Sequence, residues 1–246
     1  MAKKFKKRKP INIETYIRLI KENPIIVEAI EKIKSKFKLP VKSVLEIGTG
    51  TGMFTTKFLI ENERAKLIEK FYGMEPVDEL FEESKKFVVR LSRTDATAQE
   101  YFGGNPFDVI SFALVFSHIT DDKKRSFIKH IHNNLKENGK LIAFETFIPK
   151  YDSQESKEQN ISQFIKNNID FFKSTHNDFV MNYFCQLPKE DTDDYIFGDY
   201  KYSLENFKDL LEAADFTNIK IEEIIPKNAK SGSSNLGYYV ITADKA

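Results

Sequence analysis

The chain has 246 residues, of which 41% are hydrophobic and 30% charged, with a formal net charge of +1. These values are typical of a folded globular protein and exclude collagen-like and strongly charged disordered chains. A single cysteine excludes internal disulfides and cysteine metal clusters, and no apolar run is long enough to cross a bilayer. We therefore expect a cytoplasmic protein without a membrane segment.

Residues 1–10 form a basic segment that contains six lysines or arginines and no acidic residue. We interpret it as a solvated, disordered tail, although such a tail could also bind RNA, DNA or an acidic membrane. No aromatic RNA-stacking motif accompanies it, and no apolar segment follows it as in a secretory signal. We therefore favour the disordered tail and keep nucleic-acid binding as the alternative.

The apolar pattern predicts helices and strands in alternation along the chain. Two helices are expected within residues 11–37, interrupted near Pro24, before a short buried strand that ends in a glycine-rich turn. The expected elements are that strand at 43–50, a helix at 53–62, a strand at 70–76, a helix at 77–91, a strand near 91–96, a strand at 107–116, a helix at 121–139 with Gly139 as its stop, and a strand at 140–149. Such alternation predicts an α/β fold with a doubly wound, mostly parallel sheet.

Residues 150–202 break this rhythm because they are polar, acidic and rich in aromatic residues. Apolar residues at helical spacing, among them Ile161, Phe164 and Ile165, predict a helical cap over the carboxyl edge of the sheet. Residues 203–246 are expected to supply a helix capped by Ser203 and an antiparallel strand pair, which makes seven strands in all. The expected parts are a tail at 1–10, N-terminal helices and a ligand-binding half at 11–149, the cap insert at 150–202, and the completing segment at 203–246.

The stretch VLEIGTGTGMF, residues 44–54, places Gly48, Gly50 and Gly52 between a strand and a helix. Glycines there allow a ligand to lie against the backbone, beside the free N–H groups of the helix N-terminus. The dinucleotide fingerprint G-x-G-x-x-G fails, because other residues stand where its last glycine is required. The phosphate-loop pattern fails around Lys57 as well.

What remains, E-x-G-x-G-x-G from Glu46 to Gly52, resembles motif I of the class I S-adenosylmethionine-dependent methyltransferases. The resemblance continues over roughly residues 35–149 and 203–243, in the segments YGMEP, TDATA, FDVISFALVFSHITD, NLKENGKLIAFE and LLEAADFTNIKIEE. The last segment departs from the family pattern because Asp215 replaces the usual glycine. The alternative is a glycine-rich turn that only packs a helix on a sheet, with ordinary solvated acids at the strand ends.

The resemblance implies S-adenosylmethionine as cofactor and S-adenosylhomocysteine as product. It assigns the acid of motif I to the ammonium of the cofactor, the acid after the second strand to the ribose hydroxyls, and the acid after the third strand to the adenine amino group. Tyr16 belongs to a helix that could close over the cofactor. The expected cofactor residues are Tyr16, Glu46, Gly48, Thr49, Gly50, Gly52, Glu75, Pro76, Asp95, Ala96, Ala113 and Leu114.

The same resemblance implies methyl transfer by in-line displacement, with the loop after the fourth strand facing the methyl group. His118 in that loop could accept a proton as catalytic base, or could only pack there. The expected substrate contacts are Ser117 in this loop and Tyr183, Tyr200 and Tyr202 in the cap. We expect no metal, because the remaining histidines lack a metal-ligand spacing.

The acidic cap favours a neutral or cationic small-molecule substrate over a polyanion. Two other functions remain open: an RNA-modifying methyltransferase that uses the basic tail, and a cofactor-binding subunit without activity of its own. Some relatives use this scaffold for other sulfonium chemistry. Oxygen, nitrogen and carbon stay open as the acceptor atom, and the oligomeric state stays open as well.

Overall fold

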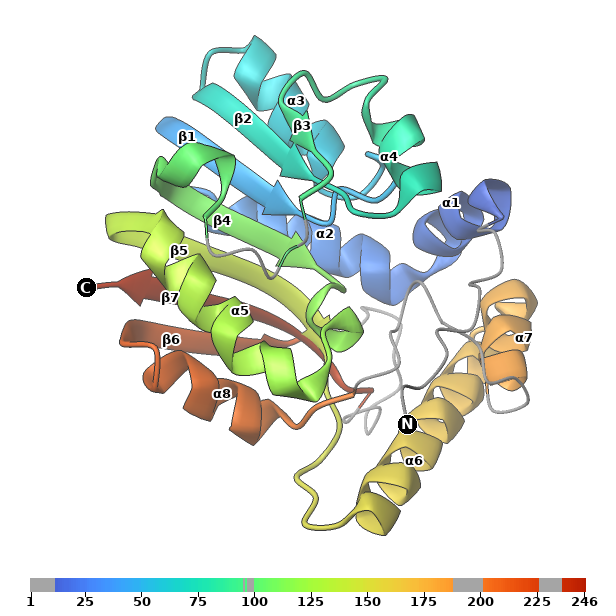
Figure 1. The fold of residues 1–246 in the computed structure, drawn as a ribbon. Coiled ribbons are helices and arrows are strands. Elements are labelled where there is room, and N and C mark those ends of the chain that lie inside the picture. Colours follow the sequence, from blue (N-terminus) through green and yellow to red (C-terminus); the bar gives the residue numbers. More distant parts are fainter. Residues whose placement is uncertain (1–11, 95, 97–99, 188–200, 226–235) are drawn as a thin grey trace, which may run out of the picture.

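The computed structural model describes residues 12–94, 96, 100–187, 201–225 and 236–246, and Figure 1 shows its fold. The helices are α1 (Ile13–Glu22), α2 (Pro24–Lys36), α3 (Thr56–Arg64), α4 (Asp78–Ser84), α5 (Asp121–Asn134), α6 (Gln154–Ser174), α7 (Asp178–Gln186) and α8 (Leu204–Glu212), with short 3-10 turns η1 (Phe102–Gly104) and η2 (Phe116–His118). The strands are β1 (Val41–Ile47), β2 (Ile68–Met74), β3 (Leu91–Ser92), β4 (Phe107–Ala113), β5 (Leu135–Thr146), β6 (Phe216–Glu223) and β7 (Tyr238–Lys245).

All seven strands form one sheet in the order β3-β2-β1-β4-β5-β7-β6. The pairs from β3 to β5 are parallel, whereas β7 runs antiparallel to both β5 and β6. The predicted fold class is therefore confirmed, including the antiparallel pair at the C-terminus. The strand order reverses between β1 and β4, and the carboxyl ends of strands beside such a reversal form the crevice where α/β sheets bind ligands.

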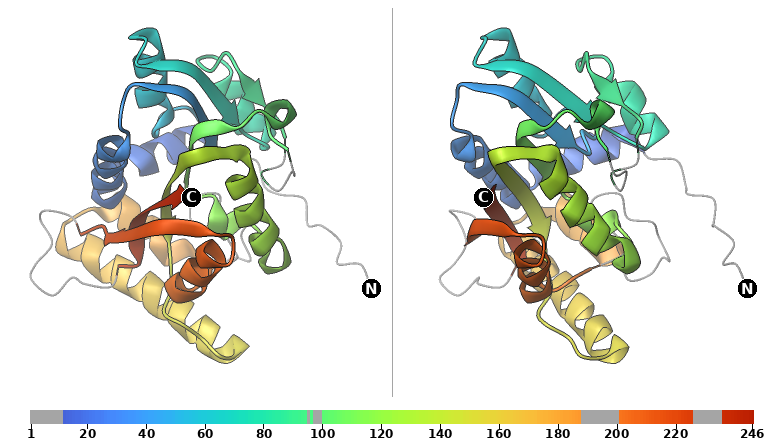
Figure 2. Two further views of the ribbon diagram at one scale, coloured as in Figure 1. Left: turned by 90° about the vertical axis from the view of Figure 1, so that its left-hand side faces the viewer. Right: turned by 60° about the vertical axis from the view of Figure 1, so that its left-hand side comes forward.

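Helices cover both faces of the sheet, as the views in Figures 1 and 2 show. Alternate residues of each central strand point to opposite faces, so that Ile142 of β5 belongs to one core cluster and Leu141 to the other. The first cluster packs β-strand residues against α2, α3, α6 and α7, and the second packs them against α5 and α8. The molecule thus has one sheet between two apolar layers.

Local capping explains where several helices begin. The side chain of Asn23 accepts hydrogen bonds from Ile25 N and Ile26 N, and Pro24 occupies the first turn of α2. Ser203 caps α8 by accepting from Asn206 N at 3.1 Å, as the sequence predicts. Asp215, which replaces the glycine of the family pattern, adopts the left-handed conformation with φ 64°. The turn after α8 therefore keeps the geometry that a glycine would have.

Two predicted helix ends are wrong. The helix expected to run to Gly139 ends at Asn134, because the next residue, Leu135, is extended and already pairs with Phe107 in the sheet. Gly139 instead allows a close backbone approach: a Cβ atom there would lie 2.7 Å from the carbonyl oxygen of Lys136. The helix expected over 77–91 is shorter as well and ends at Ser84.

The described part of the cap insert contains α6 and α7, in agreement with the prediction of a helical cap. Phe164, Phe172 and Phe184 are buried in the first core cluster, and the rings of Phe172 and Phe184 stack with centroids 5.5 Å apart. These aromatic residues therefore attach the cap to the sheet. Among the described helices, none has both the length and the apolar character that a membrane crossing requires.

Candidate functional site

A cavity of about 300 Å³ lies at the carboxyl ends of β1, β2 and β4. Its walls come from α1, the glycine turn after β1, the segment after β2, Ala96, and the loop between β4 and α5. Of the residues expected to contact cofactor or substrate, the cavity is lined by Tyr16, Gly48, Thr49, Gly50, Glu75, Pro76, Ala96, Ala113, Leu114 and His118. Segments far apart in the chain thus meet at the crevice of the strand-order reversal.

Gly48 and Gly50 of the glycine turn approach their neighbours too closely to carry a side chain. Gly48, Gly50 and Gly52 have φ values of 73°, 57° and 76°, in the left-handed region that favours glycine. A Cβ atom on Gly48 would lie 2.5 Å from Val115 Cγ2, and one on Gly50 would lie 2.7 Å from the hydroxyl oxygen of Tyr16. Gly48 and Gly50 therefore leave bare backbone on the cavity wall.

Glu75 lies at the end of β2 with its carboxylate against the glycine turn. One carboxylate oxygen accepts a hydrogen bond from Gly50 N at 2.8 Å, and the other accepts one from Val77 N at 3.0 Å. Burial raises the pKa of Glu75 to about 7, against the effect of these two hydrogen bonds. Each oxygen keeps a further acceptor position, so the carboxylate can receive two neighbouring hydroxyl groups.

Glu46 does not line the cavity. Its two carboxylate oxygens accept hydrogen bonds from the hydroxyl groups of Thr55 and Thr56, at the start of α3. Burial raises its pKa to about 8, and the nearby charge of Glu75 acts in the same direction. Glu46 therefore anchors the start of α3 beneath the glycine turn, a role that the threonine-rich segment TGMFTT does not reveal before folding.

Tyr16 reaches the cavity from α1, and its hydroxyl lies against Gly50. Burial raises the pKa of the Tyr16 phenol, and the carboxylates of Glu75 and Glu46 raise it further. The hydroxyl is therefore a neutral hydrogen-bonding group at neutral pH. It stands at the point where α1 covers the glycine turn.

Thr51 lines the cavity but was missed in the sequence. Its side chain is only 3% exposed, and among the described residues its hydroxyl has no hydrogen-bond partner. A buried hydroxyl without a partner costs about 1–3 kcal/mol, which a ligand in the cavity can recover. Together with the spare acceptor positions of Glu75 and the bare glycine backbone, it fits a nucleoside ligand with a polar tail.

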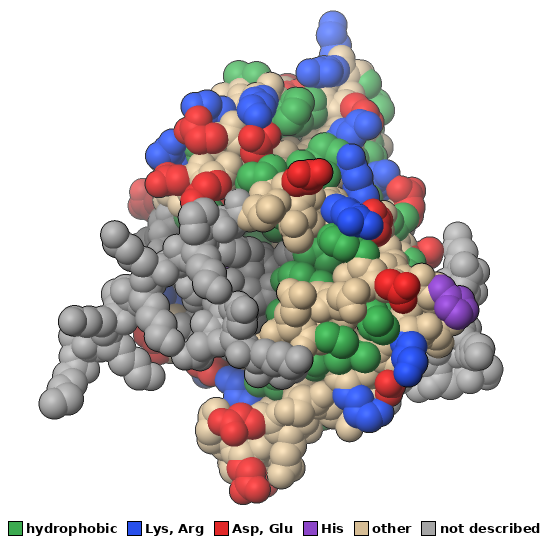
Figure 3. All heavy atoms as spheres, turned by 90° about the vertical axis from the view of Figure 1, so that its right-hand side faces the viewer, with side chains coloured by type: hydrophobic (Ala, Val, Ile, Leu, Met, Phe, Trp, Pro, Cys, Tyr) green, Lys and Arg blue, Asp and Glu red, His purple; other side chains and the backbone are tan. Residues whose placement is uncertain are grey.

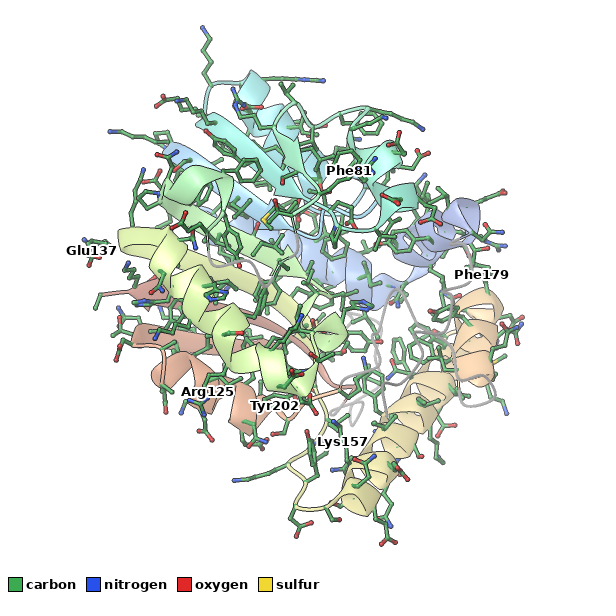
Figure 4. All side chains as sticks on the ribbon, in the orientation of Figure 1. Phe81, Arg125, Glu137, Lys157, Phe179 and Tyr202 are labelled. Carbon is green, nitrogen blue, oxygen red and sulfur yellow. The ribbon has the colours of Figure 1, made fainter. Side chains whose placement is uncertain are left out.

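Four other expected site residues lie away from the cavity. Ser117 is buried and bonded to Glu145, while Gly52 faces α4. Tyr183 packs against Phe184, and Tyr202 packs on η2, where the charge of Lys124 lies 5.3 Å from its ring centre. Figure 4 shows Tyr202 at the side of α5, near Lys157 of α6. Asp95 and Tyr200 lie outside the described residues.

The other cavity residues missed by sequence reasoning are mostly apolar and carry no motif. They include Ile20 of α1, Phe54 after the glycine turn, and Val115 and Ile119 of the loop after β4. Phe54 immediately follows the glycine motif, which is a signal that could have found it. Among the described residues, no three or more His, Cys, Asp or Glu side chains are grouped so that they could hold a metal ion.

Comparison with known sequences and structures places these observations in a family. A family model described as a methyltransferase domain matches residues 21–221. An uncharacterized methyltransferase of Bacillus cereus is 27% identical over 147 residues, which are 59% of this chain and 64% of that relative. The matched segment thus spans less than two thirds of the relative.

Solved structures share the fold at low sequence identity. A Thermotoga maritima protein, described as a SAM-dependent methyltransferase and possible histamine N-methyltransferase, is 17% identical, with a TM-score of 0.59 and 96% of both chains covered. Human N-acetylserotonin methyltransferase in complex with SAM is 12% identical, with a TM-score of 0.54 and 95% of this chain and 55% of that chain covered. Since the family model covers most of the chain, this chain belongs to the methyltransferase domain family, in agreement with its resemblance to the class I S-adenosylmethionine-dependent methyltransferases.

Proposed function

We propose that this protein transfers a methyl group from S-adenosylmethionine to a small-molecule acceptor. The cofactor supplies an electrophilic methyl group on a sulfonium. The observation that carries the proposal is the carboxylate of Glu75, which lies beside the glycine turn and keeps two acceptor positions for the ribose hydroxyls. The backbone at Gly48 and Gly50 would lie along the amino-acid tail, and Tyr16 would cover it from α1.

The acceptor is proposed to be neutral or cationic. No described lysine or arginine lines the cavity, so a phosphate group would find no counter-charge among these residues. Apolar residues border it instead, among them Ile20, Phe54, Val115 and Ile119. A cationic amine also agrees with the name of the Thermotoga maritima neighbour, a possible histamine N-methyltransferase.

The acidic residues of the cap give this proposal less support than the sequence suggested. Asp170, for example, is exposed on α6 and pairs with Lys166 at 2.6 Å. Asp121 of α5 likewise takes Lys157 of α6 as a partner at 3.0 Å. None of the described acidic residues of the cap insert lines the cavity, so the argument depends on the cavity lining.

His118 is proposed to hold or accept the proton of the acceptor group. It lines the cavity from η2, while its backbone N–H donates to the carbonyl of Val115 at 2.9 Å. Methyl transfer requires mainly that the acceptor atom be held in line at about 3–3.5 Å and that water be excluded. The apolar wall and the buried loop suit both tasks.

Calorimetry with S-adenosylhomocysteine tests the cofactor site. We expect Glu75→Ala to weaken binding by about 1–3 kcal/mol, because the ribose hydroxyls lose their acceptor. Glu79→Ala is the matched control, since Glu79 is an exposed acid in the first turn of α4 and does not line the cavity. Equal affinity of wild type and Glu75→Ala would remove Glu75 from the site. A panel of amines and phenols, assayed with labelled S-adenosylmethionine, would then identify the acceptor.

The RNA-modifying alternative depends on the basic residues 1–10, which lie outside the described residues. On the side of the molecule in Figure 3, described acidic and basic side chains are interspersed, without a continuous basic surface for a polyanion. Deleting residues 1–10 separates the two functions: RNA affinity that collapses with the deletion and with salt would favour RNA. Cofactor binding without turnover on any acceptor would favour a non-catalytic subunit.

A further inference from the structure

Glu145 is a buried carboxylate at the end of β5 that the predicted site does not use. Its side chain is fully buried, and it accepts hydrogen bonds from Ser117 N at 3.2 Å and from the hydroxyl of Ser117 at 3.1 Å. Thr146 N donates to it at 2.7 Å. Both bonds from Ser117 come from the loop between β4 and α5, so the carboxylate ties this loop to β5.

The loop held in this way forms one wall of the cavity. Leu114, Val115, His118 and Ile119 all line the cavity, whereas Ser117 points away from it toward Glu145. Leu114 has φ 56°, a conformation that is strained for a leucine and persists only where its surroundings enforce it. Its N–H donates at 2.8 Å to the carbonyl of the residue before Glu145. The end of β5 therefore holds the loop at two points.

A cation from the end of the cap insert accompanies this carboxylate. Lys201 is 5% exposed, and its ammonium donates to the hydroxyl of Thr146 at 2.9 Å. Burial raises the pKa of Glu145, whereas the positive charge of Lys201 and the hydrogen bonds from Thr146 and Ser117 lower it. A buried carboxylate is tolerated when such partners surround it, and removing one of them leaves an uncompensated charge.

We infer that Glu145 is a positioning residue that fixes the cavity wall carrying His118. Lys201, at the end of the cap insert, supplies the counter-charge of the Glu145 carboxylate. The inference rests on the proposed function, since it assigns the wall to the acceptor side. Glu145 itself makes no contact with the substrate, because its side chain is fully buried. The residue acts through Ser117 on the loop.

The donors around Glu145 suit a side chain that accepts hydrogen bonds through both carboxyl oxygens. Donors approach both oxygens: Ser117 N approaches one, while the hydroxyl of Ser117 and Thr146 N approach the other. In Glu145→Gln the amide nitrogen must face at least one of these N–H groups and cannot accept from it. The variant therefore keeps the side-chain volume but releases one point at which the loop is held.

The chain offers a comparison carboxylate at the amino ends of the strands: Asp108 of β4, whose side chain is 29% exposed. Asp108 accepts from Ser43 N at 2.7 Å and from the hydroxyl of Ser43 at 2.9 Å, and Lys136 pairs with it at 2.9 Å. A serine N–H and hydroxyl thus donate to Asp108 as they do to Glu145, but near the start of β4, whereas the cavity lies at its end. Asp108→Asn should cost stability without changing the cavity wall.

The test is the histidine NMR signal of the full chain, recorded with and without S-adenosylhomocysteine. The chain has four histidines, and His118→Gln assigns the resonance of His118. We expect Glu145→Gln to shift or broaden the His118 signal and change its titration, while Asp108→Asn leaves it in place. Once an acceptor is known, kcat should fall at least tenfold in Glu145→Gln with a smaller change in KM.

Glu145 would be only structural if Glu145→Gln leaves the His118 signal unchanged and lowers the melting temperature as Asp108→Asn does. If Glu145→Gln does not fold, Ser117→Ala removes one donor without adding a repulsive contact, and the same shift, smaller in size, is expected. An unmoved signal there would equally overturn the inference. Failure of the wild type to bind S-adenosylhomocysteine would contradict the proposed function, while the spectra without ligand still decide the role of Glu145.

Discussion

Glu75 and Thr51, two cavity-lining residues that we propose as cofactor contacts, differ in how their polar atoms are satisfied. The carboxylate of Glu75 already accepts two backbone N–H groups, so it is oriented before a ligand arrives. The hydroxyl of Thr51 is buried and has no partner among the described residues. Glu75 is thus pre-organised for its contact with a ligand, whereas the hydroxyl of Thr51 gains a partner only when a ligand binds.

Thr51→Val tests the second contact, because valine has nearly the shape of threonine without the hydroxyl. We expect S-adenosylhomocysteine affinity to fall about 5- to 20-fold, equivalent to about 1–2 kcal/mol for a lost hydrogen bond. Isothermal titration calorimetry measures it, and Thr51→Ser, which keeps the hydroxyl, should bind nearly as wild type. Repeating the titration with adenosine locates the contact on the nucleoside or on the tail. Wild-type affinity in Thr51→Val would show that the hydroxyl meets only water.

Cofactor affinity should depend on pH through Glu75. Its pKa in the free protein is raised to about 7, and only the ionised form can accept two ribose hydroxyls. The protonated fraction of Glu75 shrinks as pH rises, so affinity for S-adenosylhomocysteine should increase from pH 6 to pH 8. Below about pH 7, binding of the ligand should release a proton from Glu75. Calorimetry in buffers of different ionisation enthalpy measures both. In Glu75→Gln the slope should be lost, and an unchanged slope there would assign the titration to another group.

At the scale of elements, α1 is held to the cap as well as to the glycine turn. The amide of Asn177, which caps α7, donates to the carbonyl of Glu22 at 2.7 Å. The guanidinium of Arg18 lies 3.8 Å from the ring centre of Phe179, which Figure 4 shows on α7 beside α1. The helix that carries Tyr16 is therefore anchored through the cap insert.

Asn177→Ala should loosen α1 although Asn177 does not line the cavity. The variant loses the bond to Glu22 and the N-cap of α7, so we expect α1 amides to exchange about tenfold faster and S-adenosylhomocysteine to bind a few-fold more weakly. Hydrogen–deuterium exchange with mass spectrometry measures the first effect. Lys21→Ala on the exposed side of α1 is the control. Unchanged exchange in α1 would show that the helix is held by its packing alone.

At the scale of the whole molecule, the described cap helices share the core of the sheet. Phe184 of α7 is fully buried, and Phe164 of α6 lies with its ring centre 5.8 Å from that of Tyr238 in β7. Tyr238 in turn stacks near Phe144 of β5 at 6.2 Å. These rings run from the cap into the middle of the sheet, so the cap is expected to unfold together with the domain.

Phe184→Ala tests this expectation. Truncation of a fully buried phenylalanine costs about 3–5 kcal/mol, and we expect the melting temperature of the entire protein to fall in one transition. Differential scanning calorimetry follows it, and Phe87→Ala, at a side chain that is 48% exposed, should change it little. A separate low-temperature transition for the variant would show that the cap is an independent unit.

The sequence by itself determined the features that depend on neighbouring residues. Apolar periodicity and turn residues are local signals. The alternating elements, Ser203 as the N-cap of α8 and the glycine turn at Gly48 could therefore be predicted. The family resemblance extended this to the acid after β2, because strand ends at one edge of a parallel sheet converge on one crevice. Where local signals conflicted, prediction failed: Gly139 was assigned to a helix end, but the close backbone approach to Lys136 decided its place.

Only the tertiary structure decided which buried polar groups meet. Glu46 accepts from Thr55 and Thr56 rather than facing the cavity, and Ser117, in the loop after β4, turns to Glu145 on the neighbouring strand β5. No sequence spacing encodes such pairs, because each depends on the packing of segments distant along the chain. Burial removes water as a partner, so most polar groups in the interior take a partner from the fold, and these partners are decided only when the sheet and its helices assemble.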